Sequence, residues 1–121
     1  MSTRDSRAYL ADMLQACEDI QAMVAGFPLE QFTADRMRLK AVIRDLEVLG
    51  EAAGKLPAEL RLLAPGIPWS RITGMRHRLI HGYFGVDAAI VFKTAIEDVP
   101  ALLPPLRDLM AEAQRRAQVE G

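Results

Sequence analysis

One long segment, residues 34–56, repeats apolar side chains at the three- and four-residue spacing of an α-helix. The main apolar stripe consists of Leu39, Val42, Ile43, Leu46, Leu49, Ala53 and Leu56. A second stripe consists of Met37, Ala41, Val48 and Ala52. Together the two stripes give this helix a wider apolar surface than one neighbouring helix needs. The segment is therefore predicted to be the central helix of a bundle or part of a subunit interface, and Gly50 within it suits a close approach of another helix.

The rest of the chain divides into further helical segments, separated by proline and glycine. They are expected at about residues 7–25, 57–63, 68–81, 88–98 and 100–117. The sequence shows no strand alternation, no internal repeat and no low-complexity run. Its 121 residues are enough for one hydrophobic core and too few for a second domain. We therefore expect an all-α fold, a single-domain antiparallel helical bundle over residues 1–121.

Several helix ends can be predicted from local signals. Thr33 and Asp87 are expected to act as N-caps of the helices that follow them, after a short apolar turn at residues 27–32. The pair Pro104-Pro105 is expected to kink or divide the last segment. In residues 88–98 the expected apolar positions are Ile90, Val91 and Ile96, with Phe92 and Ala95 on adjacent faces.

Composition excludes few functions but sets the compartment that we expect. The formal net charge is −1, so any anion-binding surface must be a local patch. No segment resembles a signal peptide, and none approaches the roughly 20 apolar residues of a membrane span. We expect a soluble cytoplasmic protein with no membrane partner. The single cysteine, Cys17, fits a reducing compartment, and a buried structural thiol is a commoner role for it than a nucleophile.

Most candidate chemistry lies in a short stretch at the end of the helix predicted over 68–81. Arg76, His77, Arg78, His81 and Tyr83 fall within eight positions, and both histidines of the chain are among them. The glycines at positions 82 and 85 are typical of a helix end, because glycine tolerates the left-handed turn. The stretch is therefore predicted to lie at a helix terminus.

Arg76 and His81 form a coherent pair for cleaving a phosphodiester. A guanidinium binds two phosphate oxygens and stabilises charge in the transition state. An imidazole can take a proton from a 2′-hydroxyl or give one to the leaving oxygen, without a metal or cofactor. Side chains five residues apart on a helix point about 140° apart, so convergence requires that the chain turn at His81. The alternative is a surface arginine beside a histidine that interacts with the helix dipole.

Other interpretations of the stretch are open. His77 and His81, four residues apart, share a helix face, but position 78 is arginine and no third histidine exists, so no metal site is predicted. Tyr83 either exposes its hydroxyl or anchors the loop by packing. A basic row could contact phosphates or could simply be a solvated face. It comprises Arg36, Arg38, Lys40 and Arg44, together with Arg71, Arg76 and Arg78.

Three blocks of the sequence resemble the HEPN superfamily, in particular its HepT toxin branch. They are LGEAAGKLP (49–57), IPWSRITGMR (67–76) and HGYFGVD (81–87). The resemblance extends from about Leu10 to Leu106 and includes the motif formed by Arg76, a polar residue, His81 and Tyr83. One departure is His77, where this branch usually has asparagine.

The resemblance implies a homodimer of small helical bundles, with the two Arg/His motifs in a cleft at the interface. It implies a metal-independent ribonuclease toxin that acts on RNA and is encoded beside a minimal nucleotidyltransferase antitoxin. The antitoxin would transfer AMP to the motif tyrosine, here Tyr83. A nucleotide there would block RNA and place negative charge next to Arg76.

Glu51 is a further supporting candidate, since it could accept a hydrogen bond from Arg76 or His77 and orient it. A solvent-facing helical glutamate is the alternative. Two rival functions are open as well. The chain could be a non-catalytic HEPN-like module that binds nucleotides or the nucleotidyltransferase, or a helical dimer with only structural duties.

Overall fold

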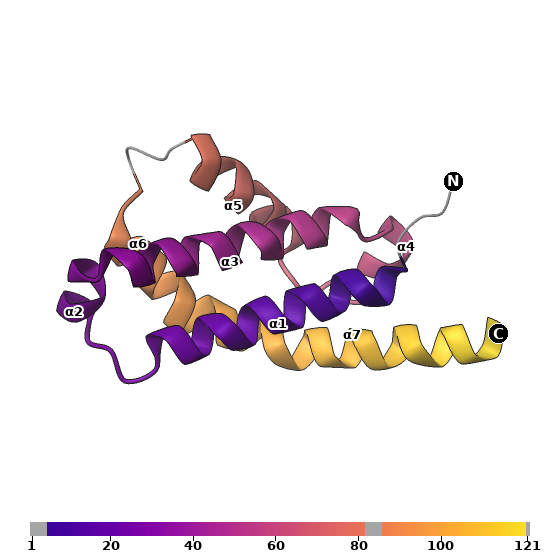
Figure 1. Cartoon of the computed structure of the whole chain (residues 1–121). Coiled ribbons are helices and arrows are strands. Elements are labelled where there is room, and N and C mark those ends of the chain that lie inside the picture. Colours follow the sequence, from indigo (N-terminus) through magenta and orange to yellow (C-terminus); the bar gives the residue numbers. More distant parts are fainter. Residues whose placement is uncertain (1–4, 82–85, 121) are drawn as a thin grey trace.

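The computed structural model describes the backbone of residues 5–81 and 86–120 and the side chains of residues 5–75 and 86–119. Helices make up the described part, which contains no strand, and the predicted all-α class is confirmed (Figure 1). The elements are α1 Ser6–Val24, α2 Leu29–Ala34, α3 Arg36–Lys55, α4 Ala58–Arg61, α5 Trp69–His81, α6 Ala88–Lys93, the π-helix η2 Thr94–Asp98 and α7 Val99–Glu120. No helix in these ranges is both long enough and apolar enough to cross a membrane.

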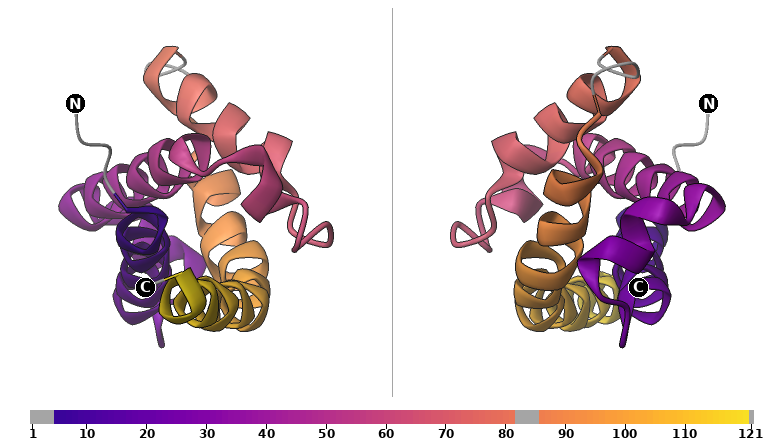
Figure 2. Two further views of the ribbon diagram at one scale, coloured as in Figure 1. Left: turned by 90° about the vertical axis from the view of Figure 1, so that its right-hand side faces the viewer. Right: turned by 90° about the vertical axis from the view of Figure 1, so that its left-hand side faces the viewer.

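The long helices form an antiparallel bundle with α3 in its middle. α1 packs against α3 and α7, and α3 packs against α5 on its other side. Figure 1 shows α1 running opposite to both α3 and α7. In the end-on views of Figure 2, α1 and α7 lie together, α5 lies on the far side, and α3 and α6 lie between them. The structure therefore supports the central position for this helix, and its alternative role at a subunit interface stays a prediction.

The main apolar stripe of α3 forms much of the core. Val42, Leu46, Leu49 and Ala53 are buried, and Leu39 and Ile43 pack against the core from partly buried positions. The second stripe changes character along the helix. Ala52 is buried, Val48 is half-buried, and Met37 at the N-terminal end is 83% exposed. Gly50 is buried on this helix, which α5 covers on one side.

The helix predicted to start at residue 34 begins two residues later, and the cap prediction for Thr33 is wrong. Asp35 caps α3, because its side chain accepts a hydrogen bond of 3.0 Å from the backbone N–H of Arg38. Thr33 lies inside α2, where its hydroxyl donates to the Glu30 carbonyl. Residues 29–34 form this additional short helix because it buries Phe32, whose ring lies 5.0 Å from that of Phe92.

The segment predicted as one helix over 88–98 is α6 followed by the π-helix η2. Asp87 caps it as predicted, accepting a hydrogen bond of 2.9 Å from Ala89. The predicted apolar face is partly wrong. Val91, Phe92 and Ala95 are buried, whereas Ile90 and Ile96 are 63% and 45% exposed. Val91 and Ala95 are four residues apart, which is ordinary helical spacing, and their face is the buried one because Phe92 beside them packs on Phe32.

Pro104 and Pro105 lie inside α7 and do not divide it. Proline lacks the N–H of a helical hydrogen bond and crowds the preceding turn. The helix continues because its apolar side remains buried on both sides of the pair. Leu102, Leu103, Leu106 and Leu109 are all buried.

Cys17 is part of this core and not an exposed nucleophile. Its side chain is fully buried. Burial raises the pKa of the thiol from its ordinary 9.0 to about 12, and the nearby carboxylates of Glu18 and Asp45 act in the same direction. Because the thiolate is the reactive form, the structure supports the structural role of Cys17.

We expect the Cys17 thiol to react with iodoacetamide only when the protein unfolds. Since the pKa is higher in the folded state, the unfolded thiol loses its proton first. The folded state should therefore lose stability as the pH rises from about 9.0 towards 12. Alkylation rates, measured against urea concentration and pH with Cys17→Ala as background, test both statements. A native protein that is alkylated as fast as the denatured protein would contradict them.

Truncating Phe32 should remove a large part of the stability. We expect Phe32→Ala to lower the free energy of unfolding by about 3–5 kcal/mol, because the ring is fully buried against Phe92. Urea denaturation followed by circular dichroism measures the change. Met37→Ala is the matched control and should change stability by less than about 0.5 kcal/mol, since Met37 is exposed.

Candidate functional site

The first turn of α5 is fixed by the indole of Trp69. Its Nε1–H donates to the carbonyl oxygens of Arg61 and Ala64, each at 3.1 Å. These carbonyls lie at and just after the end of α4, so the hydrogen bonds join α5 to the preceding segment. Ile72, on the same helix, is buried in the core. The N-terminal half of α5 is thus held in place by apolar packing and by a buried polar contact.

Thr73 of α5 lies next to Gly54 of α3. If residue 54 were alanine, its Cβ would lie 3.9 Å from the Thr73 methyl group, which is an ordinary van der Waals distance. The Thr73 hydroxyl is turned to its own helix and donates to the Trp69 carbonyl at 3.1 Å. Because α5 leans on α3 up to this point, the position and direction of its following turns are set by the bundle.

The predicted catalytic residues lie in those following turns. Arg76, His77 and His81 belong to α5, and His81 is its last residue. Their side chains lie outside the described residues, as does the whole of Tyr83. With the backbone helical through His81, ideal geometry places Arg76 and His81 about 7.5 Å apart along the axis and about 140° apart around it. Convergence of the two side chains stays a prediction.

Glu51 lies on α3, the helix that supports α5, and its side chain is exposed. This position leaves the carboxylate accessible, and its role towards Arg76 or His77 stays a prediction. Across the described side chains, no group of three or more histidine, cysteine or acidic residues could hold a metal ion. The side chains of His77 and His81 are not among the described ones.

The described members of the predicted basic row differ in their contacts. Arg38 has structural partners. It pairs with Asp35 at 3.1 Å, donates to the Met23 carbonyl at 2.8 Å, and its guanidinium lies 3.9 Å from the centre of the Phe27 ring. The other three members of the row on α3 are exposed and spaced four residues apart: Arg36, Lys40 and Arg44. Arg44 is 3.4 Å from Glu47.

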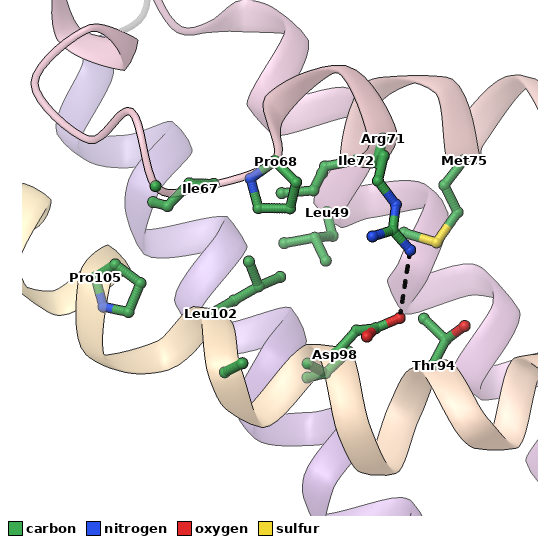
Figure 3. Close-up of a pocket in the computed structure, with 13 residues that line it drawn as sticks. Leu49, Ile67, Pro68, Arg71, Ile72, Met75, Thr94, Asp98, Leu102 and Pro105 are labelled. Atoms are coloured by element: carbon green, nitrogen blue, oxygen red, sulfur yellow. Dashed lines mark ion pairs between the residues drawn. The ribbon is translucent and has the colours of Figure 1, made fainter.

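A cavity of about 190 Å³ lies between the N-terminal half of α5 and the η2–α7 segment (Figure 3). Aliphatic side chains line its interior, and Arg71 and Asp98 face each other across it with Nη2 and Oδ2 3.9 Å apart. Sequence analysis singled out Arg71 but missed Asp98, Thr94 and Met75, which also line the cavity. The sequence did contain one observation that could have identified two of these residues. Thr94 and Asp98 are four residues apart, a spacing that predicts one shared helix face.

Comparison with known proteins identifies the family. A family model described as "Ribonuclease HepT-like" matches residues 13–109. The "Probable ribonuclease HepT" of Thermococcus cleftensis is 41% identical over 99 residues, covering 82% of this chain and 90% of the relative. A "Putative RNase" of Caldanaerobacter subterraneus is 38% identical over 104 residues, covering 86% of this chain and 93% of the relative.

The match extends over nearly the full length in a further relative. A "Putative RNase" of Methanocaldococcus jannaschii is 36% identical over 116 residues, covering 96% of this chain and 100% of that protein. No solved structure matches the chain. The family model and these relatives cover the core helices as well as the Arg76–His81 stretch. The chain therefore belongs to the HepT-like ribonuclease family and is a ribonuclease.

Proposed function

We propose that this protein is the toxin of a toxin–antitoxin system, a metal-independent endoribonuclease whose catalytic residues are Arg76 and His81. The observation that carries the proposal is the position of both residues in the last turns of α5, within a chain of the HepT-like ribonuclease family. The support of α5 by α3 and Trp69 gives these turns a rigid base, and a reacting pair needs such a base.

The two side chains supply complementary parts of one reaction. The His81 imidazole takes the proton of a 2′-hydroxyl, and the 2′-oxygen attacks the adjacent phosphorus. Arg76 binds the non-bridging oxygens and stabilises the added negative charge. The bond to the 5′-oxygen breaks, and that oxygen leaves with a proton from an imidazolium. The products are a 2′,3′-cyclic phosphate and a 5′-hydroxyl.

A homodimer solves a geometric difficulty of this reaction. On an ideal helix, positions five residues apart, such as 76 and 81, lie about 140° apart around the axis. Two copies of α5 meeting across a twofold axis would place the Arg76 of one protomer near the His81 of its partner. They would also supply two imidazoles, one to accept a proton and one to donate it. His77 and Glu51 are assigned supporting roles in orienting the pair.

Regulation would act on Tyr83. A cognate minimal nucleotidyltransferase, acting as antitoxin, would transfer AMP from ATP to the tyrosine hydroxyl and release pyrophosphate. The phosphodiester that forms carries a negative charge close to Arg76 in the sequence, and its adenosine occupies space that RNA needs. Modification would therefore remove activity without unfolding the toxin.

Substitution of either catalytic residue should abolish RNA cleavage. We expect His81→Ala to slow cleavage by about 10²–10⁴-fold, the usual contribution of general acid–base catalysis, and Arg76→Ala by about 10²–10³-fold. Rates on a labelled single-stranded RNA, measured with EDTA present, give the comparison. Arg115→Ala removes one exposed charge far along α7 and should cleave normally.

Mixing the two inactive variants tests the shared site. Heterodimers of Arg76→Ala and His81→Ala contain one intact pair if each site uses both protomers, so part of the activity should return. No recovery would mean either that the pair lies within one protomer or that cleavage needs the His81 of both protomers. Full activity of purified His81→Ala protein, with unchanged circular dichroism, would remove the catalytic assignment altogether.

Co-expression with the neighbouring nucleotidyltransferase should increase the intact mass by one or more adenylyl groups. The chain has two tyrosines, Tyr9 and Tyr83, which provide a matched pair of variants. We expect Tyr83→Phe to abolish the mass increment and Tyr9→Phe to keep it, as measured by mass spectrometry with peptide mapping. An increment that persists in Tyr83→Phe would contradict the proposed regulation.

A further inference from the structure

The cavity between α5 and α7 has the size of a single ring system. Its volume is about 190 Å³, and its walls include Ile72, Leu49 and Leu102. An apolar cavity of about 150 Å³ is large enough for benzene, whereas sites for larger ligands span about 300–1,000 Å³. The cavity therefore suits one flat group inserted from its open side, and not a whole cofactor.

Arg71 and Asp98 line this cavity, carry opposite charges, and can still form hydrogen bonds with a ligand. Arg71 Nη2 and Asp98 Oδ2 are 3.9 Å apart, well beyond the roughly 2.7–2.9 Å of a charge-assisted hydrogen bond. Figure 3 shows the two side chains reaching towards each other from opposite helices, beside the apolar walls. A guanidinium has five donors and a carboxylate about four acceptor positions. Both groups can therefore bind a ligand edge that carries acceptors and donors together.

The far wall belongs to η2, a π-helix, and such segments occur frequently at functional sites. Thr94 begins η2 and lines the cavity. Its hydroxyl donates to the Ile90 carbonyl at 2.9 Å, so its oxygen can still accept a hydrogen bond. This wall thus adds a polar group to an aliphatic cavity, a combination typical of small-ligand sites.

The cavity lies beside the proposed catalytic residues along one helix. Met75, which lines it, directly precedes Arg76. Arg71 lies about 7.5 Å from Arg76 along the axis of α5 and about 140° from it around the axis, and Met75 lies about 100° from Arg76 around the axis. The axial distance is about two nucleotide rises of roughly 3.4 Å in a stacked strand. An RNA bound at Arg76 therefore reaches the cavity only if it bends around α5 and unstacks a base there.

We propose that this cavity binds one unstacked base of the RNA substrate and that it prefers guanine. The inference rests on the proposed ribonuclease site of α5. Guanine presents the O6 and N7 acceptors, which arginine binds in a bidentate manner. Its Watson–Crick edge also carries the N1–H and N2–H donors for a carboxylate. Each of the other three bases offers the pair a weaker match, and apolar side chains on both sides suit the flat faces of a base.

Nucleotide binding tests the cavity without any cleavage. Guanosine 5′-monophosphate, titrated into the full chain, should shift the amide resonances of Arg71, Thr94, Asp98 and Leu102. The AMP, CMP, UMP and inorganic phosphate titrations should cause weaker shifts. Asp98→Asn should weaken guanosine monophosphate binding by about tenfold or more. Asp108→Asn, an exposed change on α7 outside the cavity, should leave it unchanged.

Cleavage preference provides the second measurement. On RNAs that differ in one base, Asp98→Asn should reduce cleavage near guanine by about tenfold and leave other sites unaffected. Ala101→Phe, at an exposed position of the cavity rim, should have the same selective effect by filling the space. If Ala101→Phe does not fold, the Asp98→Asn variant and the wild-type titration still decide the question.

The two proposals can fail separately. Guanosine monophosphate binding in the cavity of a protein that cuts no RNA would support this inference and overturn the catalytic one. Cleavage that depends on Arg76 and His81, with no selective effect of Asp98→Asn, would overturn this inference alone. Equal or larger shifts with another nucleotide, or with phosphate alone, would also overturn the guanine assignment.

Discussion

The burial of the apolar side of α3 is the constraint on which the rest of this bundle depends. Leu46, Leu49 and Ala53 are almost wholly removed from water, and each large aliphatic side chain of this kind contributes about 1.5–3 kcal/mol. Because the buried arc is wide, α1 and α5 both find a surface on the same helix. α5 thereby gains a fixed support, although Ile72 is the one buried side chain among its residues 69–75.

That support determines what α5 can do chemically. Trp69 fixes its beginning with two hydrogen bonds, and Thr73 lies against α3 at Gly54. The turns that carry Arg76 and His81 continue this supported helix. A general acid–base residue works only within hydrogen-bond reach of its substrate, so small errors in the direction of α5 would be costly. In the proposed mechanism, stability and catalysis both depend on the contact between α3 and α5.

The arginines of the described part differ in whether they stabilise the fold or remain accessible to a ligand. The chain is nearly neutral, so long-range attraction of RNA contributes little and local groups must bind it. Arg38 is used for the fold, since it connects the Asp35 cap to the Met23 carbonyl and the Phe27 ring. Arg71 is paired only loosely with Asp98 and is available to a ligand at the cavity.

Local signals in the sequence determined the long helices and the Asp87 cap and pointed to Arg76 and His81 as candidates, because helical spacing, capping and side-chain chemistry act over a few residues. The sequence did not determine which apolar side chains are buried against another helix. Ile90 and Ile96 are exposed because the face with Val91, Phe92 and Ala95 is the one that packs on the core, where Phe92 contacts Phe32. Asp35, and not Thr33, caps α3 because α2 forms to bury Phe32. Only the tertiary structure brought Arg71 and Asp98, distant in the chain, to one cavity, since periodicity defines a face but not its neighbour.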